Sequence, residues 1–197
     1  MKKNWKNLAI YAALAVTAFS LTGCSSAPAN NTNAGTETTT EAPKPILVLT
    51  IGTKDNLKNY DYFYEAANPN SDALTWDASN PDADTLIAIL AETTGWNLNL
   101  AEPVYVSPGS FTIYFAEDSS IYTGAVDSTK ADFAITDRQE LVNTILDSIV
   151  ANLNAAYNES LTIYFAAADG GDIVIADSGI TISSSEPYAE SEEESEE

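Results

Sequence analysis

TDRQELVNTILDSIVANL, residues 136–153, is the stretch that sets the architecture of this chain. Large aliphatic side chains recur there at steps of four, and a second aliphatic row runs beside the first. The two rows are Leu141, Ile145, Ile149 and Leu153, and Val142, Leu146 and Val150. Two adjacent rows make a wide apolar face, which is typical of a helix that lies across a β-sheet.

Two pairs of residues at the start of this stretch suit the beginning of a helix. A capping Thr or Asp binds a backbone N–H, and a Gln or Glu three residues later can bind back. Thr136 with Gln139, and Asp137 with Glu140, both have this spacing. The sequence leaves both pairs open.

A second helix is predicted over residues 81–94. Asn80 is a good N-cap, and Pro81 suits the first helical position because the N–H that proline lacks would have no partner there. Asp82 and Asp84 add negative charge at the positive end of the helix dipole. Gly95 suits the left-handed position that ends a helix.

Alternating or continuous apolar runs predict the strands. The first run, residues 46–51, is aliphatic throughout except for Thr50, which indicates a buried strand. Pro108 followed by Gly109 predicts a type II turn, and with it a hairpin. The predicted strands are residues 46–51, 98–106, 111–115, 161–165, 173–175 and 180–182.

Residues 54–76, rich in Tyr, Asn and Asp, predict an irregular excursion with a short helix around residues 60–67. Elsewhere the sequence repeats itself, since FTIYFA at residues 111–116 and LTIYFA at 161–166 are nearly identical. Each segment follows a predicted helix. A duplicated α–β unit would explain this echo, and so would the shared requirements of a half-buried strand.

The pattern predicts an α+β fold, in which two amphipathic helices pack on one face of a mostly antiparallel sheet. A single domain is expected over residues 46–185, a length that supports one hydrophobic core. Residues 186–197 are strongly acidic and predict a disordered tail.

The beginning of the chain is typical of an exported, lipid-anchored protein. Three lysines precede an apolar run that ends in LTGC, residues 21–24. This ending resembles the bacterial lipobox, which implies that residues 1–23 are removed and that Cys24 carries a diacylglycerol anchor. An ordinary signal peptide with a chance cysteine is the alternative. Residues 24–45 lack large apolar side chains and predict a flexible linker, with the domain on the extracytoplasmic face of the cell membrane.

The composition excludes several kinds of chemistry. The chain has no histidine and one cysteine, so Ser-His-Asp and Cys-His nucleophile systems are excluded, as are disulfides and Cys/His zinc sites. Carboxylate pairs, Ser-Lys dyads and oxygen-ligated cations remain compatible. We therefore expect no enzyme, no cofactor and no metal site. With 8 basic and 29 acidic residues, the net charge of −21 also excludes a nucleic-acid footprint.

From Asp84 onward the chain resembles the GerMN (sporulation and germination) domain family. The resemblance rests on residues 86–92 (LIAILAE), 111–115 (FTIYF) and 139–146 (QELVNTIL). It implies a small α/β module on secreted or lipid-anchored bacterial proteins, some of them linked to sporulation or germination, which acts in interaction or assembly without catalysis.

The leading functional expectation is a non-catalytic interaction module with a protein partner in the cell envelope. A ligand-binding lipoprotein for sugars or peptides is the alternative, with Trp76, Trp96, Tyr62 and Tyr64 as candidate binding residues. A concave pocket lined by several of these aromatics would favour ligand binding, and an open sheet face or edge would favour assembly. A hydrolase, the third reading, would need two carboxylates facing each other across a cleft.

Overall fold

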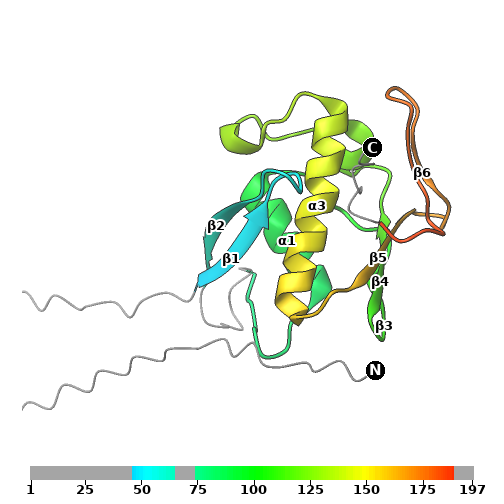
Figure 1. Cartoon of the computed structure of the whole chain (residues 1–197). Helices are drawn as coiled ribbons and strands as arrows, with labels where there is room; N and C mark the ends of the chain where they lie inside the picture. The colour runs from blue at the N-terminus through cyan, green and yellow to red at the C-terminus, as the bar shows by residue number, and fades with distance from the viewer. Residues whose placement is uncertain (1–45, 65–73, 189–197) are drawn as a thin grey trace, which may run out of the picture. The chain divides into compact units, whose positions relative to one another are not determined.

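Helix α3 (Arg138–Tyr157) runs through the middle of the molecule, with strands on either side of it (Figure 1). The computed structural model describes residues 46–64 and 74–188. The predicted leader, Cys24, the linker and residues 65–73 lie outside the described residues.

The described elements confirm an α+β fold. The strands are β1 (Ile46–Ile51), β2 (Lys58–Phe63), β3 (Tyr105–Ser107), β4 (Ser110–Phe115), β5 (Thr162–Ala167), β6 (Ile173–Ile175) and β7 (Ile180–Ile182). The helices are α1 (Ala83–Thr94), the short α2 (Ser120–Thr123), a 3-10 turn (Ala131–Phe133) and α3.

The strands form three small sheets. β1 and β2 make an antiparallel ribbon, β6 and β7 a hairpin, and β3, β4 and β5 a three-stranded sheet. β3 and β4 are antiparallel, as the predicted hairpin requires, whereas β4 and β5 are parallel. The two echoed segments therefore lie side by side, with Phe111 opposite Ile163, so that identical positions are offset by two residues.

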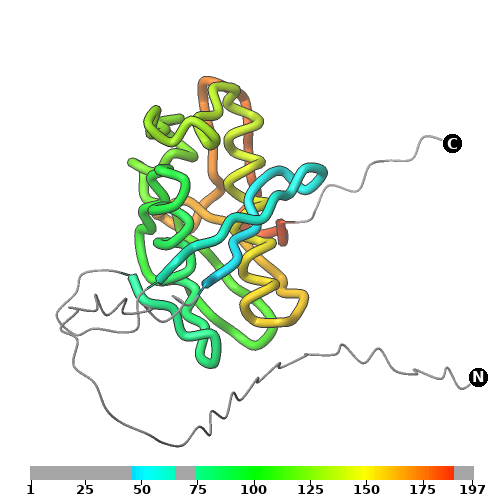
Figure 2. Tube along the Cα trace, turned by 90° about the vertical axis from the view of Figure 1, so that its left-hand side faces the viewer, coloured from blue at the N-terminus to red at the C-terminus, as the bar shows by residue number. Residues whose placement is uncertain are grey.

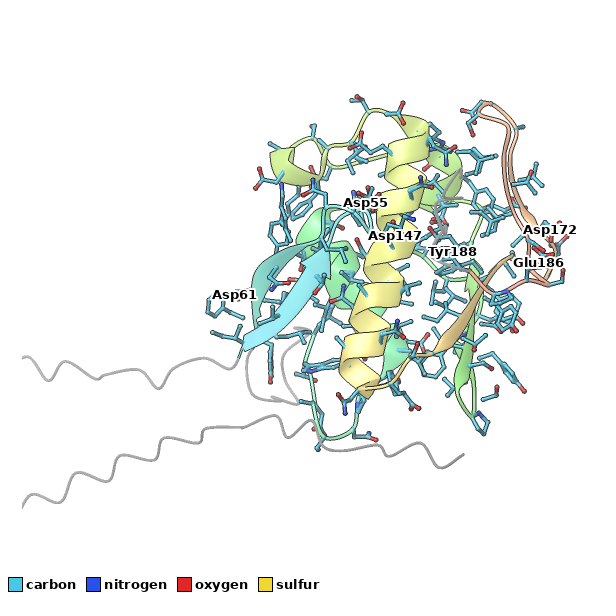
Figure 3. The ribbon with its side chains drawn as sticks, in the orientation of Figure 1. Asp55, Asp61, Asp147, Asp172, Glu186 and Tyr188 are labelled. Atoms are coloured by element: carbon cyan, nitrogen blue, oxygen red, sulfur yellow. The ribbon has the colours of Figure 1, made fainter. Side chains whose placement is uncertain are left out.

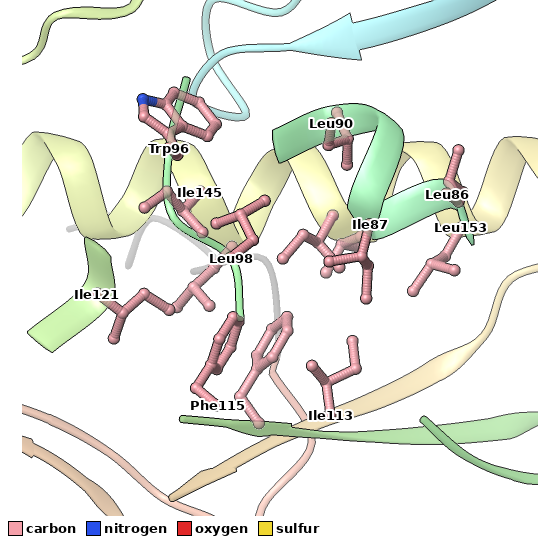
Figure 4. Packing of buried hydrophobic residues seen from close by; sticks show 14 of the residues in the cluster. Leu86, Ile87, Leu90, Trp96, Leu98, Ile113, Phe115, Ile121, Ile145 and Leu153 are labelled. Atoms are coloured by element: carbon pink, nitrogen blue, oxygen red, sulfur yellow. The ribbon is translucent and has the colours of Figure 1, made fainter. Parts of the chain in front are cut away.

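The main core lies between α1, α3 and the three-stranded sheet. Figure 4 shows side chains of both helices pointing toward Ile113 and Phe115 of β4. Ile113, Phe115 and Ile145 have no exposed surface, and Ile87 of α1 is 2% exposed. The alternation of β4 and the wide apolar face of α3 are thereby both confirmed.

Both helix starts depend on an aspartate. Asp137 caps α3 by accepting from the N–H of Glu140 at 2.8 Å, which confirms the capping half of the second predicted pair. The predicted start of α1 is wrong: the helix begins at Ala83 because Asp82 is the cap and accepts from the N–H of Thr85 at 2.8 Å. The predicted end is confirmed, with Gly95 left-handed at φ 74°.

Two predicted segments differ from the structure. The helix predicted around residues 60–67 is wrong for Tyr60–Phe63, which belong to β2, because alternate tyrosines face the core. The strand predicted over residues 98–106 reduces to β3 and an isolated bridge between Leu100 and Phe115. Pro103, which has no N–H to donate, separates the two.

The β1–β2 ribbon lies against α3 (Figure 1 and Figure 2), and side chains of α3 take the place of a neighbouring strand. Asn152 accepts from the N–H of Thr50 at 2.9 Å and donates to its C=O at 2.5 Å. Ser148 accepts from the N–H of Gly52 at 3.1 Å. Side chains of α3 thereby satisfy the outward-facing backbone groups of Thr50, near the end of β1, and the N–H of Gly52 after it.

Gly52 is required where β1 turns away from α3. Its φ is +147°, and an added Cβ would lie 2.2 Å from the backbone oxygen of Asn56. A side chain therefore has no room at this position. Glycine allows the loop that follows β1 to fold back close to its own backbone.

The C-terminal boundary of the domain lies beyond the predicted one. Tyr188, assigned from the sequence to the disordered tail, packs edge-on against Phe165 with ring centroids 5.2 Å apart. Its N–H donates to the C=O of Ile163 at 2.7 Å, and its hydroxyl donates to Asp147 at 2.8 Å. The prediction of a tail from residue 186 is therefore wrong for residues 186–188, and residues 189–197 lie outside the described part of the chain.

Candidate functional site

The four aromatic candidates do not meet in one pocket. Trp96 is 2% exposed, its indole N–H donates to the C=O of Phe133 at 3.0 Å, and the two rings meet edge to face at 6.1 Å. Trp96 is therefore a core residue whose polar atom is satisfied.

The other three candidates lie elsewhere. Trp76 is 8% exposed and lines a separate cavity of about 280 Å³ with Leu47 and Leu86. Tyr62 donates to Glu92 at 2.9 Å, and burial together with this hydrogen bond raises the pKa of Tyr62 to about 12. Tyr64 is partly buried against the core. No sugar-stacking platform is assembled from these side chains.

An apolar surface lies instead on the outward side of the β1–β2 ribbon. Because successive strand residues face opposite sides, Ile46 and Val48 point away from the core, opposite Phe63 and Asp61 of β2. The exposed fraction of the side chain is 49% for Ile46, 50% for Val48 and 57% for Phe63. We call this surface the outer ribbon face; its residues are Ile46, Val48, Thr50, Asn59, Asp61 and Phe63.

The outer ribbon face corrects the prediction of a fully buried first strand. Leu49 and Ile51 are buried, but Ile46 and Val48 are half exposed. The continuous aliphatic run predicts burial on both faces of the strand, but the core covers only one face of the two-stranded ribbon. The run marks an apolar surface that nothing in the described chain covers.

A polar cleft of about 500 Å³ lies on another side of α3, bounded by the loop after β1 and by β7. Asp147, only 8% exposed, forms part of its floor. One carboxylate oxygen accepts from the backbone N–H of Lys54 and the other from the hydroxyl of Tyr188, both at 2.8 Å. Figure 3 shows Asp55, Asp147 and Tyr188 along this side of the molecule.

Asp147 was missed by the sequence reasoning. Its neighbours one turn away on the helix include Asn143, Thr144 and Ala151, so the sequence pattern does not distinguish it from a solvent-facing acidic residue. Its two hydrogen bonds hold the loop and the C-terminal segment against α3, so its role in the cleft is to position the walls. Among residues 46–64 and 74–188, no group of three or more His, Cys, Asp or Glu residues could hold a metal ion.

No protein-family model, curated protein or solved structure matches this chain. The resemblance to the GerMN family therefore stays a prediction, as does the duplication of an α–β unit. Within the described part of the chain, the helices are too short or too polar to cross a bilayer.

Proposed function

We propose that this protein is a lipid-anchored, non-catalytic interaction module that binds a partner protein on the extracytoplasmic face of a bacterial cell membrane. The observation that carries the proposal is the outer ribbon face. Ile46 and Phe63 are a directly opposed cross-strand pair, and Val48 continues the same apolar surface. Large, contiguous and half-exposed side chains are typical of protein contact sites. The GerMN resemblance supports an assembly role and is the sole basis for a link to sporulation or germination.

The charge of the chain narrows the choice of partner. At a net charge of −21, a second copy or an anionic lipid surface would be repelled. Asp61 lies on the outer ribbon face, directly opposite Val48. The surface therefore fits a partner that offers apolar side chains and at least one basic group.

The anchor is tested by fractionating cells that express Cys24→Ala. The wild type is expected with the membranes and the variant in the soluble fraction, because the thiol is the proposed acylation site and two acyl chains suffice for stable anchoring. Ser25→Ala is the matched control and should stay with the membranes. A wild type that is already soluble, or a Cys24→Ala variant that stays membrane-bound, contradicts the anchor.

The outer ribbon face is tested by Phe63→Ser, with Tyr105→Ser as the matched control. Tyr105 is 63% exposed and lies on β3, away from the ribbon, so both changes remove one exposed ring. Crosslinked wild type and Tyr105→Ser should recover the same envelope protein, and Phe63→Ser should recover at least about tenfold less, as expected when an aromatic side chain of the interface is lost. Equal recovery by all three proteins would show that this face is not the interface.

A further inference from the structure

Helix α3 already binds one extended segment through the side-chain amide of Asn152, and it presents two more amides to the polar cleft. Asn152 binds both the N–H and the C=O of Thr50, as a neighbouring strand would. Gln139 and Asn143 line the cleft on a different side of the helix, and Gln139 donates to Asn143 at 3.0 Å. Within the described residues, the amide donor of Asn143 has no partner, so this pair can bind another backbone.

The opposite wall of the cleft is a strand edge. β7 pairs with β6 along one side, and Ile180, Thr181 and Ile182 all line the cleft. No other strand among residues 46–64 and 74–188 pairs with β7. An unpaired edge offers backbone donors and acceptors at the spacing of an incoming strand.

The interior of the cleft suits side chains that alternate. Its accessible apolar side chains are Ile180 and Ile182, which are partly buried, and Val142 and Leu146 lie fully buried beneath. A strand laid along β7 would turn every second side chain toward this apolar surface and the others toward solvent. The volume of about 500 Å³ lies in the range of ligand sites in proteins.

The charges select a basic occupant. Asp55 and Asp147 line the cleft against one cation, Lys54. Tyr188 also lines it, and the carboxylate of Glu186 lies beside Tyr188 and the β7 residues Thr181 and Ile182. These acids would attract a basic segment and repel an acidic one.

We propose that this cleft binds an extended peptide segment of a partner protein, with alternating basic and apolar side chains, by strand addition to β7. Asn143 binds the peptide backbone from the helix side. A sugar fits less well, because Tyr188 is the one aromatic in the lining and its hydroxyl is already bonded to Asp147. The site is separate from the outer ribbon face, so either can fail without the other.

The test uses the full-length lipidated protein in detergent and fluorescence anisotropy of a labelled nine-residue peptide of alternating Lys and Val. Saturable binding is expected. A peptide with Glu in place of Lys should not bind, and a Lys–Val peptide N-methylated at alternate residues should lose binding, because it cannot complete the strand.

Single substitutions test whether the peptide binds in this cleft. Asn143→Ala is expected to weaken binding by about tenfold, the loss of one good hydrogen-bonding group at an interface. Asn59→Ala and Phe63→Ser, on the outer ribbon face, should bind like the wild type. Recovery of the envelope protein by Phe63→Ser therefore tests the outer ribbon face. Peptide binding by Asn143→Ala tests the cleft, so the two proposals can fail independently.

Several results would overturn the proposal. These are no binding of the Lys–Val peptide, equal binding of the Glu–Val peptide, no effect of N-methylation, or unchanged affinity in Asn143→Ala. Binding that occurs only after residues 189–197 are removed would also overturn it, since the occupant would then be the chain's own tail.

Discussion

An Ile145→Asp variant is expected to lose the cooperative fold. Ile145 has no exposed surface and lies where α3 faces the core between α1 and β4. Truncation of such a side chain alone costs about 2–5 kcal/mol. An unpaired carboxylate at the same place adds a further penalty of several kcal/mol. The two together compare with the whole stability of a typical domain, about 5–15 kcal/mol.

The measurement is circular dichroism with urea titration, and the matched control is Ala155→Asp. Ala155 is exposed on the same helix, so the same change there should cost at most about 1 kcal/mol, mainly through the helix dipole. A cooperative unfolding transition in Ile145→Asp with near-native stability would show that this face of α3 does not form the core.

The second largest effect is expected for Asn152→Ala. Asn152 is 3% exposed and satisfies both the N–H and the C=O of Thr50. Its removal leaves two backbone groups without a partner, each worth about 1–3 kcal/mol. The free energy of unfolding should therefore fall by about 2–6 kcal/mol, with the slope of the urea transition unchanged.

Two further variants identify the cause. Asn152→Asp keeps the shape and the acceptor for the N–H of Thr50 but turns an oxygen toward its C=O, so it should also be destabilising. Asn143→Ala, an Asn-to-Ala change on the same helix at a partly exposed position, should stay within about 0.5 kcal/mol of the wild type. If Asn152→Ala were as stable as Asn143→Ala, the ribbon would not depend on α3 for its hydrogen bonds.

The sequence predicted best those helices and strands whose apolar residues recur at a spacing that places them all on one buried face. The two rows of α3 and the alternation of Phe111, Ile113 and Phe115 are read directly from spacing. β2 was missed because its inward residues are tyrosines, at Tyr60 and Tyr62, among Asn and Asp that favour turns. The parallel pairing of β4 with β5 could not be predicted, since strand order depends on long-range packing.

The candidate binding surfaces could be predicted from the sequence less well than the fold could. The aromatic residues predicted from the sequence as a binding site lie apart, since Trp96 is a core residue and Trp76 lines a cavity of its own. The cleft depends on Asp147 and Tyr188, which are 41 residues apart and meet only when the chain has folded. Exposure of Ile46 and Val48 likewise depends on the core covering only one face of the β1–β2 ribbon, which no local pattern specifies.

The parallel pair of echoed strands also bears on solubility. Residues 111–116 and 161–166 contain no charged residue, proline or glycine, and such short β-prone segments readily stack between chains. In the native state each segment is paired with the other and covered by helices on one side. Once the domain opens, every chain exposes two nearly identical segments that can pair with those of its neighbours. Burial of β4 and β5 therefore stabilises the fold and also prevents aggregation. The high negative charge of the chain opposes the same association.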